Sequence, residues 1–134
     1  MDSLTIEQRR SGDVLILDLS GQITLGATNR QLQDAIRQLV AEGERSMILN
    51  LAKVKYIDST GLGELVAGYS TLKRNEGRLA LINVSDRVMD LMTITKLYTV
   101  FDIYDVEAAA VESFASNASS AATFATGFAS SRLS

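Results

Sequence analysis

The chain has 134 residues, of which 46% are hydrophobic and 22% charged, and its formal net charge is −3. This size and balance fit one domain with its own core, and the mixed charges exclude the basic surface that a nucleic-acid binder needs. Cysteine and histidine are both absent, which excludes disulfides, thiol nucleophiles, Ser-His-Asp triads and the commonest metal ligands within this chain.

A hairpin is expected to open the fold. Residues 4–9 alternate loosely, and residues 14–19 form a near-continuous apolar run. Turn residues at 11–13 separate the two segments, so the pattern predicts antiparallel strands, the second covered on both faces. The Ser-Gly pair at 20–21 is expected to end the second strand, leaving residues 22–25 as a short edge piece.

Two helices are expected to flank the next strand. Apolar residues at helical spacing predict a helix that is capped by Thr28 or Asn29 and ends at Gly43. Residues 46–51 predict a strand that residues 54–57 continue after a bend at residues 52–53. Strand, helix and strand in this order predict a parallel crossover. A second helix is expected over about residues 60–75, and its core stripe comprises Leu62, Leu65, Val66, Tyr69 and Leu72.

The remaining elements complete an α/β fold. Residues 78–84 predict a strand, and Ser85 or Asp86 is expected to cap a third helix. Residues 100–104 predict a last short strand, and a fourth helix follows Asp105. This order indicates a mixed sheet of four to five strands with about four helices, mainly on one face.

The composition changes near Ser113. From there to residue 131 no charged residue occurs, and alanine, serine and threonine dominate. We therefore expect a domain over residues 1–112, followed by a tail over residues 113–134. The tail is either loose or a short docked helix, because four of its residues share helical spacing: Ala121, Phe124, Ala125 and Phe128.

The stretch Tyr56–Gly63 joins a strand to a helix through a carboxylate, two hydroxyls and two glycines. We interpret it as presenting Ser59 beside a helix N-terminus, where unpaired N–H groups favour an added negative charge. A phosphate there would lie next to Asp58 and reverse the local surface charge, as a switch requires. The simpler alternative is that Asp58, Ser59 or Thr60 only caps the helix, with Thr60 preferred among the three. Gly61 is expected to adopt an unusual φ angle.

A small-residue face follows on the same helix. Opposite the core stripe lie Gly63, Ala67, Ser70 and Thr71. Glycine costs about 1 kcal/mol relative to alanine inside a helix, so a smooth face indicates close packing. The packing element is either a neighbouring helix of the domain or a partner, and proximity to Ser59 favours a partner.

No competing site emerges. Aspartates at 18, 34, 58, 86 and 102 have no metal-ligand spacing, and the Gly-Leu-Gly sequence lacks the Gly-Lys-Ser/Thr of a phosphate loop. We therefore expect no metal, no cofactor and no enzymatic activity. The N-terminus shows no signal-peptide pattern, and no apolar run approaches the roughly 20 residues of a spanning helix. We expect a cytoplasmic protein without membrane insertion.

The sequence Asp-Ser-Thr-Gly-Leu-Gly at 58–63 resembles the motif of the STAS domain, and more narrowly that of the bacterial anti-sigma factor antagonists. The resemblance extends over about residues 4–112. It includes four further segments, at residues 48–51, 19–21, 77–79 and 100–104.

The resemblance implies a partner-switching regulator of transcription. The unmodified protein would bind an anti-sigma factor, a serine kinase of the histidine-kinase-like ATPase fold, and so free a sigma factor. The kinase would phosphorylate Ser59 and the complex would dissociate, and a PP2C-type phosphatase would reverse the change. The antagonist itself would catalyse nothing. The implied partner-binding residues are Asp58, Ser59, Thr60, Gly61, Leu62, Gly63 and Ala67.

Two departures from the family pattern keep alternatives open. The chain contains no proline, although family members often carry one before the third helix, and the tail extends past the usual boundary. One alternative is a STAS subunit of a lipid-transport or signalling-scaffold complex, in which the same surface docks a partner permanently. An enzyme or small-ligand binder is a further alternative, but the residues that usually supply its chemistry are absent.

Overall fold

A computed structural model describes residues 4–24 and 30–115. Strands β1 (Thr5–Ser11) and β2 (Val14–Ile23) form the predicted antiparallel hairpin. The expected break at residues 20–21 was wrong, because β2 continues through it. Gly21 takes a φ of 108°, and the pairing of β2 with the neighbouring strand shifts register on both sides of it. The Ser-Gly pair therefore makes an irregularity in β2 and does not end it, because β2 stays paired with β3 on both sides of Gly21.

The other elements follow largely as predicted, except that β3 runs without interruption through the bend expected at residues 52–53. The sheet order is β1-β2-β3-β4-β5. Only the β1–β2 pair is antiparallel, so the sheet is mixed. The bounds of these elements are α2 (Gln31–Ala41), β3 (Ser46–Ile57), α3 (Ser59–Arg74), β4 (Arg78–Ile82), α4 (Asp86–Thr95), the 3-10 turn η1 (Leu97–Thr99) and β5 (Asp102–Tyr104). Residues 107–115 form a further helix, the 107–115 helix.

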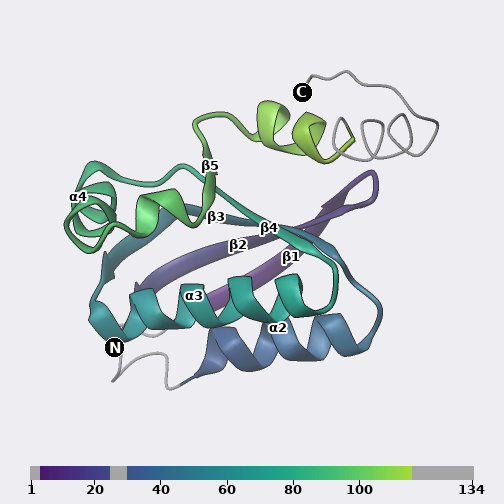
Figure 1. The fold of residues 1–134 in the computed structure, drawn as a ribbon, viewed down its shortest axis with the longest axis horizontal. Helices are drawn as coiled ribbons and strands as arrows, with labels where there is room; N and C mark the ends of the chain where they lie inside the picture. The colour runs from purple at the N-terminus through teal and green to yellow at the C-terminus, as the bar shows by residue number, and fades with distance from the viewer. Residues whose placement is uncertain (1–3, 25–29, 116–134) are drawn as a thin grey trace.

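The main core lies between one face of the sheet and helices α2, α3 and α4. Figure 1 shows α2 and α3 side by side along this face. The predicted apolar stripes of α2 and α3 supply side chains to this core, and Ile36, Leu65 and Leu72 are fully buried. Each such side chain contributes about 1.5–3 kcal/mol on burial. The core therefore fixes the helix that begins at Ser59.

The start of α2 is capped from another helix. Arg30 precedes α2 in a left-handed conformation (φ 72°) and provides no side-chain cap. The predicted caps, Thr28 and Asn29, lie outside the described residues. Glu64 of α3 is buried and accepts a hydrogen bond at 3.3 Å from the backbone N–H of Gln33. The two helices are thus joined by a polar contact as well as by their apolar stripes.

The second face of the sheet is partly covered by the 107–115 helix (Figure 1). Ala110 and Phe114 pack on a smaller apolar cluster formed by Val14, Ile16, Ile48, Ala80 and Ile82. Residues 113–115 of the expected tail are therefore helical and packed on the domain. The character of the rest of the tail stays a prediction, because residues 116–134 lie outside the described part of the chain.

Candidate functional site

The central turn is organised by an aspartate cap. Asp58 is extended (φ −98°, ψ −176°), and its side chain accepts a 2.7 Å hydrogen bond from the backbone N–H of Gly61. Helix α3 begins at the next residue, Ser59. Asp58 was one of the three expected caps and is confirmed. The preference for Thr60 was wrong, because Thr60 lies inside the first turn of α3.

The two glycines of the motif have different roles. A Cβ atom added at Gly61 would lie 1.6 Å from the backbone oxygen of Ile23. Gly61 therefore lets α3 pack directly on the end of β2. The expectation of an unusual φ there was wrong, since Gly61 is not among the glycines with positive φ. Gly63 is exposed and has no atom within 4 Å of an added Cβ.

Ser59 is exposed, and its hydroxyl makes no hydrogen bond with any described residue. Among the other predicted partner-binding residues, Thr60 and Gly63 are exposed and Asp58 and Ala67 are half-buried. Gly61 and Leu62 are buried. Gly61 and Leu62 are therefore covered by the domain itself. The other five residues are at least partly accessible to a partner: Asp58, Ser59, Thr60, Gly63 and Ala67.

The predicted small-residue face of α3 also divides. Gly68, which was not assigned to this face, is buried against α2, and a Cβ added there would lie 2.5 Å from Cδ1 of Ile36. Thr71, predicted as part of a docking face, is buried and donates to the backbone oxygen of Ala67 at 2.9 Å. This side belongs to the packing of the domain itself. The strip through Gly63, Ala67 and Ser70 stays at least partly exposed.

A groove runs beside Ser59, between the central turn and α4. Its volume is about 440 Å³, and it is lined by Tyr56, Ile57, Asp58, Ser59, Arg87, Val88, Asp90, Leu91 and Ile94. Two of its apolar side chains are unusually exposed, Tyr56 at 44% and Ile94 at 79%. Exposed large apolar side chains that gather at one place mark interaction surfaces.

Sequence reasoning missed the α4 side of this groove. The helical spacing of Arg87, Leu91 and Ile94 was available, but the groove exists only because α4 packs beside the end of β3. Nothing in the linear pattern places residues of α4 next to Ser59. The sequence predicted Val88, Leu91 and Met92 as the inner face of α4. Val88 and Met92 are buried, whereas Leu91 is half-buried and lines the groove, and Ile94 faces solvent.

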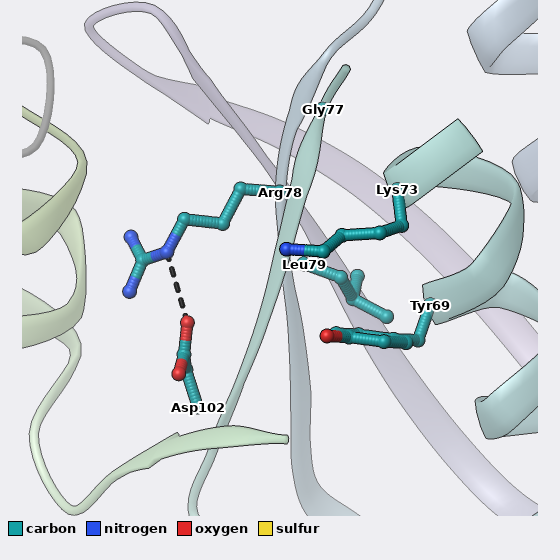
Figure 2. Close-up of a pocket in the computed structure, with 6 residues that line it drawn as sticks. All are labelled: Tyr69, Lys73, Gly77, Arg78, Leu79 and Asp102. Carbon is teal, nitrogen blue, oxygen red and sulfur yellow. Dashed lines mark hydrogen bonds and ion pairs between the residues drawn. The ribbon is translucent and has the colours of Figure 1, made fainter. Parts of the chain in front are cut away.

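A second pocket, of about 350 Å³, lies between α3 and the sheet edge formed by β4 and β5 (Figure 2). It is lined by Tyr69, Lys73, Gly77, Arg78, Leu79 and Asp102. The guanidinium of Arg78 is fully engaged, since it donates to Asp102 at 2.9 Å and to Tyr104 at 3.0 Å. It also donates to Ser113 and stacks 4.3 Å from the ring centroid of Phe114. Arg78 therefore fastens the 107–115 helix to the sheet.

Across residues 4–24 and 30–115, no group of acidic side chains is arranged to hold a metal ion. Within the same residues, no helix combines the length and apolar character needed to cross a membrane.

Comparison with known proteins agrees with this architecture. The model of the STAS domain matches residues 5–110. An anti-sigma F factor antagonist of Paenibacillus polymyxa is 30% identical over 108 residues, which cover 78% of this chain and 90% of the relative. The chain belongs to the STAS domain family, among the anti-sigma factor antagonists.

Solved structures show the same fold. The crystal structure of an anti-sigma factor antagonist from Mycobacterium paratuberculosis has a TM-score of 0.73 at 25% identity, covering 84% of this chain and 94% of that one. A cell fate determinant of Bacillus, solved in its phosphorylated form, has a TM-score of 0.63 at 19% identity and covers 82% of this chain and 99% of that one. The likeness to the Bacillus protein concerns the fold.

Proposed function

We propose that this protein is a phosphorylation-controlled binding partner of an anti-sigma factor serine kinase. In the unmodified form it holds the kinase and thereby frees a sigma factor. The kinase transfers the terminal phosphoryl group of ATP to the hydroxyl oxygen of Ser59 and releases ADP, after which the complex separates. A PP2C-type phosphatase removes the phosphate by hydrolysis and restores the binding form.

The observation that carries the proposal is that Asp58 caps α3, whereas the neighbouring Ser59 hydroxyl is exposed. A serine at a helix start is often only a cap, but Asp58 occupies the cap position here. The Ser59 hydroxyl is exposed and has no hydrogen bond within the described residues. It therefore has no role in stabilising the described fold and is available to a modifying enzyme.

The surroundings explain how a phosphate would switch binding off. Ser59 lines the groove in which Tyr56 and Ile94 are exposed. A partner that covers these side chains removes water from the groove. A phosphoserine carries a charge of about −1.5 to −2, and burying such a charge without a partner costs about 3–5 kcal/mol. Because 1.4 kcal/mol is a tenfold change in affinity, binding would weaken by roughly 100-fold or more.

The folded domain itself would tolerate the modification. Ser59 is the first residue of α3, and a negative charge at a helix N-terminus contributes about 0.3–1 kcal/mol of stabilisation. Repulsion from the adjacent Asp58 carboxylate opposes this term. The phosphate therefore changes the docking surface without unfolding the helix. The absence of histidine and cysteine is consistent with a protein that is modified and does not itself catalyse.

The site of modification is tested with the cognate anti-sigma factor kinase and ATP. We expect the intact mass to rise by one phosphate and fragment spectra to place it on Ser59. The Ser59→Ala variant should take up none. Phosphate on Thr60, or no phosphate on the wild type, would refute the proposal.

The switch is tested by calorimetric titration of the kinase. We expect Ser59→Asn to bind within a few-fold of the wild type, whereas Ser59→Asp should bind at least about tenfold more weakly. Asparagine and aspartate have the same shape, so this pair isolates the charge. Equal affinities of the two variants would contradict the electrostatic explanation.

A further inference from the structure

Among the described residues that line the groove beside Ser59, one side chain is basic, Arg87 of α4. Residues 87, 91 and 94 recur every three to four positions, so they share one face of the helix, the face that lines the groove. Arg87 is exposed and makes no hydrogen bond or ion pair within the described residues. A guanidinium that makes no hydrogen bond or ion pair within the described residues therefore lines the same groove as the Ser59 hydroxyl.

The carboxylates that line the groove do not engage this guanidinium. Asp58 accepts the backbone N–H of Gly61 at 2.7 Å and so caps α3. Asp90 lies three residues after Arg87, but no ion pair joins them in the described structure. A carboxylate carries one charge, whereas phosphoserine carries nearly two and offers three acceptor oxygens. Arginine binds such a group through two parallel N–H···O bonds, so a phosphate would attract Arg87 more strongly than either carboxylate does.

We propose that Arg87 receives the phosphate placed on Ser59 and forms an ion pair with it across the groove, between the N-terminus of α3 and α4. This inference rests on the proposed function, because it needs a phosphate at Ser59. The pair spans the groove in which Tyr56 and Ile94 are exposed. Phosphorylation then acts in two ways, since it adds charge and also covers the apolar docking surface.

The ion pair is tested on protein in which phosphoserine is incorporated at position 59 during translation, so that no kinase is needed. A ³¹P NMR titration follows the second ionisation of the phosphate, whose pKa is ordinarily about 6. At low salt we expect this pKa to be about half a unit lower in the wild-type background than with Arg87→Gln. The difference should largely vanish at about 1 M NaCl, where exposed charges are screened.

Two further variants separate a specific pair from a general effect of charge. Lys55→Gln removes the same charge from an exposed residue that does not line the groove. Its phosphate should titrate as in the wild-type background. Arg87→Lys should give an intermediate pKa, because the ammonium group lacks the planar fork of arginine. Thermal unfolding checks that every variant is folded.

Identical phosphate pKa values with Arg87 and with Arg87→Gln would overturn the inference. An equally large rise with Lys55→Gln would also overturn it, because net charge alone would then explain the shift. The experiment needs no kinase, so its result does not depend on whether a kinase modifies Ser59. A shift that depends on Arg87, found together with a kinase that never modifies Ser59, would support the ion pair and refute the proposed function.

Discussion

Replacing Gly61 by alanine should destabilise the protein, whereas replacing Gly63 by alanine should stabilise it. At Gly61 the new methyl group would lie 1.6 Å from the oxygen and 2.5 Å from the carbon of the Ile23 carbonyl. Ordinary C···O contacts are about 3.3 Å, so α3 and β2 must separate by roughly 1.5 Å. At Gly63 nothing lies within 4 Å, and the change only improves helix propensity.

The magnitudes follow from these two geometries. Overpacking costs about 1–3 kcal/mol, and Gly61 lies at the upper end because its neighbour is backbone and cannot rotate away. After the gain in helix propensity, Gly61→Ala should lower the free energy of unfolding by about 2 kcal/mol. Gly63→Ala should raise it by about 1 kcal/mol. The two variants should therefore differ by about 3 kcal/mol.

Equilibrium unfolding in urea measures this difference. With a slope of about 1.5 kcal/mol/M, the midpoints of the two variants should lie roughly 2 M apart, on either side of the wild type. Gly68→Ala provides an intermediate case, because its added Cβ would meet the mobile end of the Ile36 side chain at 2.5 Å. A Gly61→Ala protein as stable as the wild type would refute the reasoning, as would a Gly63→Ala protein that is the less stable of the two.

Two further predictions concern the 107–115 helix. Hydrogen bonds from Arg9 hold the pKa values of Asp18 and Glu107 below their ordinary values of 3.8 and 4.5. Their contribution to stability is therefore present above about pH 5 and is lost as the pH falls toward 3. Arg9→Met should reduce that loss in urea unfolding, and an unchanged pH dependence would contradict the assignment. Phe114→Ala should cost about 3 kcal/mol, because it removes a buried ring. Val106→Ala, at a residue 57% exposed, should cost under about 0.5 kcal/mol, and equal losses would count against docking of this helix.

Much of the fold could be predicted from local pattern. The apolar run of β2 predicted a strand buried on both faces, and its residues Val14–Leu17 and Leu19 are all buried. The stripe of α3 likewise predicted its inner face. Ser85 was one of two expected caps for α4, and it accepts the backbone N–H of Val88 at 3.2 Å. These predictions succeed because period and cap chemistry depend on neighbours within a few residues.

The errors arose where distant segments meet. The motif showed that Gly61 matters, but its reason, the carbonyl of Ile23, is 38 positions earlier in the chain. Thr71 was assigned to a docking face because helical spacing cannot show which side of α3 faces α2. Capping of α2 by Glu64 could not be read from the sequence either, since the two residues it joins are 31 positions apart.

The sequence by itself determined the strand-to-helix turn, the presence of Ser59 at its start and the absence of histidine and cysteine. It also offered Asp58 as one of three candidate caps. The tertiary structure shows that Asp58 caps α3 and that the Ser59 hydroxyl is exposed and has no hydrogen bond in the described fold. It alone placed Arg87, Ile94 and the rest of α4 beside that hydroxyl. The physical reason is that capping and helical period are local, whereas a groove is made by two elements that the packing of the core brings together.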